Sequence, residues 1–123
     1  MRMPFIISKV NVPISKEQEI QLKARLGKAI ELVPGKSEEY LLTGFEENYH
    51  LYLRGDDSQP IAYIKASIFG NEGHYGYDKL TMEITKIFGE ILGIAPHHVY
   101  VKYDDIQGWG VNGMYFDRNQ YME

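Results

Sequence analysis

The chain has 123 residues, no cysteine, 44% hydrophobic and 24% charged residues, and a formal net charge of -4 at pH 7. This length and composition predict a single globular domain over residues 1–123, and the lack of cysteine excludes disulfides, thiolate chemistry and cysteine-based metal sites. The negative charge argues against nucleic acid or a membrane surface as a partner. No apolar stretch approaches about 18 residues, and the chain has no signal sequence. We therefore expect a cytoplasmic protein.

The first predicted element is a strand over residues 5–12, with Pro4 directly in front of it and Met1-Arg2-Met3 before that proline. Proline commonly occupies the first position of a strand, which is a purely structural explanation for Pro4. The other explanation is chemical, because a proline at the start of a mature chain has a free secondary amine, which is a strong base. While Met3 is joined to Pro4, that nitrogen is acylated and is not basic.

A helix follows this strand. Ser15 and Gln18 form a capping-box pair that starts the helix near Lys16, and Gly35 ends it, because the residue after a helix favours a positive φ. The apolar residues of the helix recur at the spacing of one helix face. They are Leu22, Leu26, Ala29, Ile30 and Val33.

A second strand is predicted over residues 41–47, and residues 49–53, which alternate between apolar and polar side chains, are a candidate short strand. Shifting the chain by 58 residues lays its second half on its first half without a gap. The two internal repeats are about residues 4–57 and 62–116. The pattern of the second repeat predicts a strand, a helix and a strand over residues 63–70, 77–92 and 99–105.

Each repeat is therefore a βαβ unit whose two strands run parallel, because the crossover connection between them is right-handed. Two such units predict an α+β fold, a duplicated βαβ ferredoxin-like sandwich in which two helices cover one face of a four-stranded sheet. The other face of the sheet stays bare in a chain that contains 10 Tyr, 5 Phe and 1 Trp. A bare face with many apolar and aromatic groups predicts self-association.

Short motifs follow one another along nearly the whole chain, from the Met3-Pro4-Phe5-Ile6 start to a C-terminal segment with the single tryptophan. They cover residues 3–6, 11–13, 35–40, 67–68, 77–80, 99–103 and 109–116. Taken in this order, they resemble the macrophage migration inhibitory factor (MIF) family of the tautomerase superfamily. The resemblance implies a homotrimer with active sites between subunits and catalysis without a cofactor or metal.

The resemblance also implies a catalytic role for Pro4 as the base that moves a proton between oxygen and carbon of a small aromatic 2-oxo acid or its enol, typically a phenylpyruvate. A dry aromatic pocket would keep the proline nitrogen partly neutral. Lys36 would bind the substrate carboxylate, together with a backbone N–H at Ile68 or Phe69. The other pocket residues that the resemblance implies, some from a neighbouring subunit, are Tyr40, Tyr100, Lys102, Trp109, Val111 and Phe116.

Two functions of other classes stay open. One is a catalytically inactive MIF-like protein that keeps the fold for partner binding, including a cytokine-type role outside the cell without a cleavable signal. The other is a module that binds a small ligand such as an amino acid, because ferredoxin-like domains often do so at subunit interfaces and fold alone does not define function. A natural protein that retains Met1 and does not catalyse tautomerisation favours the interaction protein. Thermal stabilisation by an amino acid, without turnover of an arylpyruvate, favours the ligand-binding module.

Overall fold

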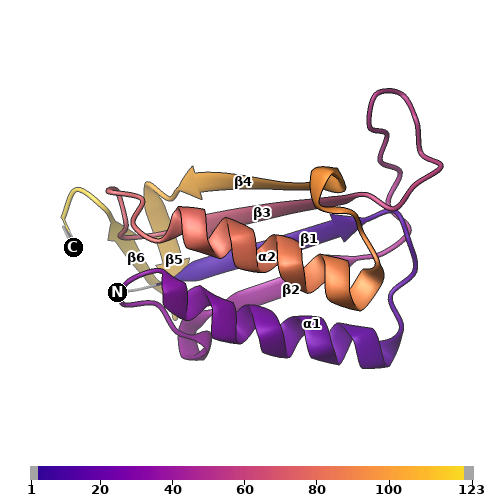
Figure 1. Cartoon of the computed structure of the whole chain (residues 1–123). Helices are drawn as coiled ribbons and strands as arrows, with labels where there is room; N and C mark the ends of the chain where they lie inside the picture. Colours follow the sequence, from indigo (N-terminus) through magenta and orange to yellow (C-terminus); the bar gives the residue numbers. More distant parts are fainter. Residues whose placement is uncertain (1–2, 121–123) are drawn as a thin grey trace.

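A four-stranded mixed sheet forms the centre of the molecule, with strands in the order β2-β1-β3-β4 (Figure 1). The computed structural model describes residues 3–120. The strands are β1 (Pro4–Val10), β2 (Leu42–Glu46), β3 (Ala62–Ile68) and β4 (Val99–Asp105). The helices α1 (Lys16–Ala29) and α2 (Tyr77–Leu92) lie side by side across one face of this sheet.

The strand pairing confirms the predicted duplicated βαβ sandwich. Strand β1 pairs parallel with β2, and β3 pairs parallel with β4, so each repeat contributes two neighbouring strands. The two units meet where β1 pairs antiparallel with β3. β1 begins at residue 4 and β3 at residue 62, which is the offset of the sequence repeat.

The first helix ends earlier than predicted. The α-helix stops at Ala29 and continues only as a 3-10 turn over Ile30–Leu32. The next residue, Val33, is extended, with a φ of -90° and a ψ of 123°. Its neighbour Pro34 explains this, because the proline ring excludes the helical conformation for the residue before it. Gly35 has the expected positive φ of 77°, but it lies beyond the end of the helix.

The candidate strand over residues 49–53 is wrong. Within the described chain this segment forms only a single bridge between Leu53 and Asp56. The intervening Arg54 and Gly55 have φ values of 54° and 75°, so the backbone reverses there in a tight turn. The N–H of Tyr49 still donates a hydrogen bond to the Val10 oxygen at the end of β1, but beyond it the segment between β2 and β3 extends away from the sheet (Figure 1).

A short hairpin, which the sequence reasoning missed, follows the main sheet. Strands β5 (Gly108–Val111) and β6 (Met114–Asp117) pair antiparallel in a separate two-stranded sheet. Asn112 and Gly113 form the turn with φ values of 56° and 73°. The dipeptide Asn-Gly between two short apolar segments is a strong hairpin signal, so this element was predictable from the sequence.

The main core lies between the helices and the sheet. Both helices bury their apolar faces there, as the helical spacing in the sequence predicts. The fully buried large side chains of this core are Ile6, Leu22, Leu26, Ile30, Ile64, Ile68, Leu80, Ile84, Ile87, Phe88 and Ile94. No helix among residues 3–120 has both the length and the apolar content needed to cross a membrane.

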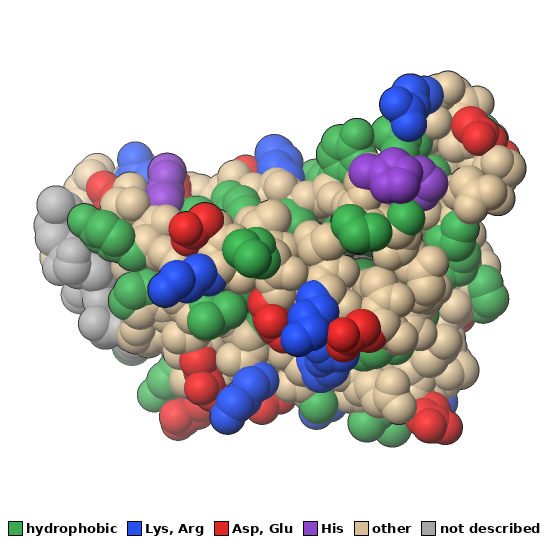
Figure 2. All heavy atoms as spheres, in the orientation of Figure 1, with side chains coloured by type: hydrophobic (Ala, Val, Ile, Leu, Met, Phe, Trp, Pro, Cys, Tyr) green, Lys and Arg blue, Asp and Glu red, His purple; other side chains and the backbone are tan. Residues whose placement is uncertain are grey.

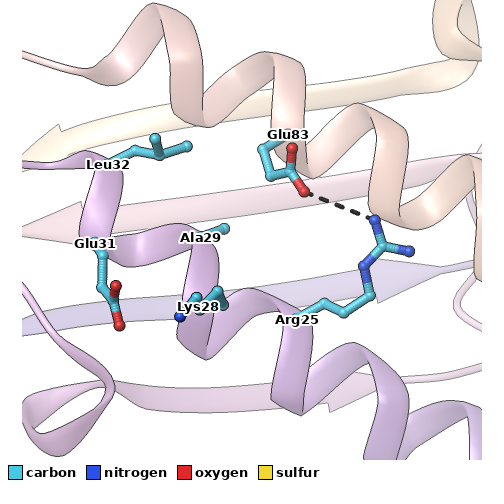
Figure 3. A pocket seen from close by; sticks show the side chains of 6 residues that line it. All are labelled: Arg25, Lys28, Ala29, Glu31, Leu32 and Glu83. Carbon is cyan, nitrogen blue, oxygen red and sulfur yellow. Dashed lines mark ion pairs between the residues drawn. The ribbon is translucent and has the colours of Figure 1, made fainter.

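Acidic and basic side chains are interspersed over the helix-covered face (Figure 2). Arg25 on α1 links the two helices through ion pairs to Glu83 at 3.7 Å and Glu90 at 2.7 Å. Between the helices, a hollow of about 450 Å³ is lined by Arg25, Lys28, Ala29, Glu31, Leu32 and Glu83 (Figure 3). The hollow contains none of the residues predicted to bind substrate.

Candidate active site

Pro4 is the first residue of β1, an inner strand of the sheet, and it lies opposite Ile68 of β3. The residue is buried. A proline has no N–H to donate to a sheet, and the first position of a strand tolerates this loss best. The fold therefore places Pro4, as a buried residue, at the end of the sheet where β3 finishes.

Three side chains next to this position form a second, smaller core that we call the aromatic cluster. Its buried members are Met3, Phe69 and Phe116, and the partly buried Ile106 and Trp109 pack against them. Phe69 directly follows β3, whereas Trp109 and Phe116 face each other across the hairpin of β5 and β6. The missed hairpin thus brings two of the predicted pocket residues, Trp109 and Phe116, into this cluster.

Lys36 is almost completely buried, with only 4% of its surface exposed. Its Nζ donates hydrogen bonds to the backbone oxygens of Phe69 at 2.8 Å and Gly70 at 3.4 Å. An ammonium group away from water needs such acceptors, because desolvation of an unpaired charge is very costly. These bonds fix the position of Lys36 Nζ beside the backbone that carries Phe69 of the aromatic cluster.

Two other predicted residues, Tyr100 and Lys102, lie on β4 at a distance from Pro4. The register pairs Pro4 with Ile68 and Ile68 with Asp105, so Tyr100 is five residues along β4 from the row of Pro4. At about 3.3 Å per residue this separation is roughly 16 Å. Within one chain, the structure therefore does not bring Tyr100 next to Pro4.

Tyr100 and Lys102 instead line a separate apolar hollow of about 300 Å³. The sequence reasoning did not assign a site role to two of its aromatic residues, Tyr52 and Tyr63. Tyr52 comes from the protruding segment before β3, and Tyr63 pairs with Tyr100 across the sheet. The remaining lining residues are Leu51, Leu53, Ile61, Ala62 and Val101.

The last two predicted pocket residues are on the surface of the single chain. Tyr40 ends a short 3-10 helix, Glu38–Tyr40, that follows Lys36, and its side chain is exposed. Val111 ends β5 and is also exposed. The structure thus gathers Pro4, Ile68, Lys36 and the aromatic cluster at one place and leaves Tyr40, Tyr100, Lys102 and Val111 outside it.

A stack of rings anchors the loop that follows Phe69. His74 contacts Asp105 at the end of β4, with 2.8 Å between Nε2 and Oδ2, and its ring stacks on Tyr77. The Tyr77 ring stacks in turn on Tyr103, with 4.4 Å between the ring centroids. These contacts connect the loop to α2 and β4 and so hold the backbone that Lys36 binds.

This ring stack predicts a loss of stability at high pH. Burial, followed by the nearby charge of Asp105, raises the pKa of Tyr77 from 10.0 to about 12. The folded state favours the neutral phenol of Tyr77. The contribution of this phenol to the free energy of unfolding is therefore complete below pH 10 and is lost as the pH rises from 10 to about 12. At pH 11, about one pH unit above the ordinary pKa, we expect this loss to be roughly 1 kcal/mol in the free energy of unfolding, because solvent screens part of the effect.

Urea unfolding of the parent chain and of Tyr77→Phe at pH 8 and pH 11 measures this effect. Tyr77→Phe keeps the ring and removes the ionisable group. Between pH 8 and pH 11 its free energy of unfolding is therefore expected to fall less than that of the parent chain, by the contribution of Tyr77 given above. Tyr52→Phe, at an exposed position, serves as the matched control and is expected to behave like the parent chain. Equal losses in Tyr77→Phe and the parent chain contradict the prediction.

Comparison with known proteins identifies the family. The family model described as macrophage migration inhibitory factor (MIF) matches residues 3–116, which is nearly the whole chain. The chain belongs to the MIF family. No curated protein sequence matches this MIF-family chain.

Solved structures of other proteins, two of them named as MIF proteins, share its fold. MIF2 from Leishmania major is 25% identical in sequence, with a TM-score of 0.85 over 93% of this chain and 97% of that protein. A MIF homologue from Prochlorococcus marinus is 23% identical, with a TM-score of 0.79 over 91% and 98% of the two chains. A third structure, of Pt0534 inactivated by 2-oxo-3-pentynoate, is 18% identical, with a TM-score of 0.78 over 89% and 93%.

Proposed function

We propose that this MIF-family chain is a cofactor-independent keto–enol tautomerase of phenylpyruvate-like 2-oxo acids, with Pro4 as its catalytic base. The observation that supports the proposal most is the convergence of three groups at one end of the sheet. These are the buried Pro4, the aromatic cluster and the ammonium group of Lys36. The inactivation of Pt0534 by a 2-oxo acid shows that such a compound reacts with a protein of this fold.

In the proposed reaction, the free amine of Pro4 takes a proton from C3 of the keto acid and returns a proton to the carbonyl oxygen. The reverse transfer converts the enol to the keto acid. An apolar environment disfavours the charged form of an amine, so the aromatic cluster would lower the pKa of the Pro4 nitrogen. A base whose pKa lies near the working pH transfers protons most efficiently.

Lys36 and the aromatic cluster would orient the substrate for this transfer. The substrate carboxylate would accept a charge-assisted hydrogen bond from Lys36 Nζ, helped by a backbone N–H at Ile68 or Phe69. The aryl ring would contact Trp109 and Phe116, whose faces favour aromatic and apolar groups. Binding in a fixed orientation contributes to the rate because it replaces a random encounter by a positioned one.

A homotrimer is part of the same proposal. Within one chain Tyr100 lies roughly 16 Å and Lys102 roughly 10 Å along β4 from the row of Pro4, so we infer that they reach a substrate at Pro4 from a neighbouring subunit. The helix-free side of the sheet also exposes large apolar groups, including Tyr100 and Leu42. Such groups favour contact with another copy of the chain. In this assembly Tyr40, Lys102 and Val111 would complete the pocket.

The proposed chemistry depends on the residue at which the working protein begins. Only a chain that begins at Pro4 has a free amine, and general acid–base catalysis typically contributes about 10²- to 10⁴-fold to a rate. We therefore expect the chain that begins at residue 4 to convert enol phenylpyruvate at least about 100-fold faster than the full chain. The ultraviolet absorbance of the enol measures this rate, and the intact mass of the natural protein shows its first residue.

A second candidate function is a non-catalytic interaction protein with the same fold. The observation that favours it is the burial of Met3, which has 5% of its surface exposed while it is joined to Pro4. This function would be supported if the full chain and the chain that begins at residue 4 both converted enol phenylpyruvate only at the uncatalysed rate, and if the natural protein retained Met1. The same results would contradict the tautomerase.

A further inference from the structure

Met3 packs like a core residue although it lies near the start of the chain. Its side chain belongs to the aromatic cluster with Phe69 and Phe116, and Trp109 packs against the same group. Methionine is flexible and polarizable, so it fills irregular spaces between aromatic rings well. In the full chain, the space between these rings is therefore already filled.

The path of the Met3 side chain coincides with the path that a ligand at Pro4 would follow. The Met3 carbonyl carbon is bonded to the Pro4 nitrogen, so its side chain starts next to that nitrogen and ends among the aromatic rings. A 2-oxo acid that gives a proton to the same nitrogen must also start beside it. The apolar end of that acid then needs the volume that Met3 occupies.

We propose that Met3 is a tethered ligand of the aromatic cluster and that, in the full chain, it excludes small carboxylic acids with an unbranched apolar or aryl substituent. This inference rests on the proposed function, because it takes the aromatic cluster as the substrate pocket. The segment before Pro4 thus blocks the site in two separate ways. It acylates the proline nitrogen, and it fills the pocket.

The two blocks are separable by mutation in the full chain. Met3→Ala removes most of the side chain from the cluster but leaves the Pro4 nitrogen acylated. This variant is therefore expected to bind a carboxylic acid without catalysing tautomerisation. Met3→Leu keeps an apolar side chain of similar volume and is expected to keep the pocket closed.

Trp109 reports on this pocket directly, because it is the only tryptophan of the chain and packs against the cluster. The probe is 3-phenylpropionate, which has the carboxylate and ring of the proposed substrate but lacks its 2-oxo group. Its dissociation constant is measured from the change in Trp109 fluorescence. The matched control is Met82→Ala, at a methionine on α2 that is 73% exposed.

We expect Met3→Ala to bind 3-phenylpropionate about 10- to 100-fold more tightly than the full chain, which is the affinity equivalent of one buried methionine side chain. Met3→Leu and Met82→Ala are expected to bind as weakly as the full chain. Equal affinities of Met3→Ala and the full chain overturn the inference, as does tight binding by Met3→Leu. If Met3→Ala does not fold, Met3→Ser, which also leaves the Pro4 nitrogen acylated, replaces it, with the same expected gain.

These outcomes are distinct from a failure of the tautomerase itself. If Met3→Ala binds the probe more tightly than the full chain but the chain that begins at residue 4 does not convert enol phenylpyruvate, the proposed function is wrong and the role of Met3 as a tethered ligand stands. If that chain is active but Met3→Ala shows no gain in affinity, only the inference about Met3 is wrong.

Discussion

Replacement of Pro4 by glycine in a chain that begins at residue 4 is expected to lower kcat/KM for enol phenylpyruvate by about 10²-fold or more. Glycine keeps a terminal amine, but this amine is primary and is no longer held by the pyrrolidine ring. Glycine also has far more backbone freedom than proline, so the nitrogen loses its fixed orientation. General-base catalysis depends on that position as well as on basicity.

A second proline provides the matched control for this experiment. Pro13 lies in the exposed connection between β1 and α1, and Pro13→Gly is expected to keep the turnover of the parent chain. Its cost in stability is expected to be about 1 kcal/mol or less, because it acts mainly through the entropy of the unfolded chain. Light scattering is expected to give the mass of three chains for both variants. An unchanged rate in Pro4→Gly would exclude Pro4 as the base.

Replacement of Lys36 by methionine is expected to raise KM for phenylpyruvate by about 10- to 100-fold. A hydrogen bond to a charged group contributes about 1.5–3 kcal/mol, and each 1.4 kcal/mol is a factor of ten in affinity. The variant also loses the hydrogen bond from Nζ to the backbone oxygen of Phe69, so the free energy of unfolding is expected to fall by about 1–3 kcal/mol.

Two further variants separate binding from structure. Lys36→Arg keeps the positive charge and is expected to restore part of the affinity. Lys28→Met, at an exposed position of α1, is expected to change neither KM nor stability measurably. Steady-state kinetics and urea unfolding of all three variants provide the measurements. A Lys36→Met chain that is less stable but has an unchanged KM would restrict Lys36 to a structural role.

Local sequence signals predicted most of the helices and strands. The capping box of Ser15 and Gln18 forms as expected, and α2 has the predicted bounds of Tyr77 and Leu92. The glycines that flank α2, Gly76 and Gly93, both have positive φ values. Such signals are reliable because capping and backbone conformation depend on residues a few positions apart.

The errors have local causes too. The helical spacing predicts a first helix that is too long, because it takes no account of the restriction that Pro34 places on Val33. The alternating pattern of residues 49–53 suggested a strand, but a strand also needs a partner, and the protruding segment has none among the described residues beyond one bridge. The hairpin was missed although Asn112-Gly113 is its usual turn.

The sequence by itself determined the two βαβ units, their cores and, through motif order, the family to which the chain belongs. Only the tertiary structure showed that Lys36 binds the backbone of Phe69, 33 residues away, and that Met3 is buried with Phe116. Only the strand register placed Tyr100 far from Pro4 in the same chain. The reason is that helix faces and turns are set by neighbouring residues, whereas these contacts arise only after distant segments have packed together.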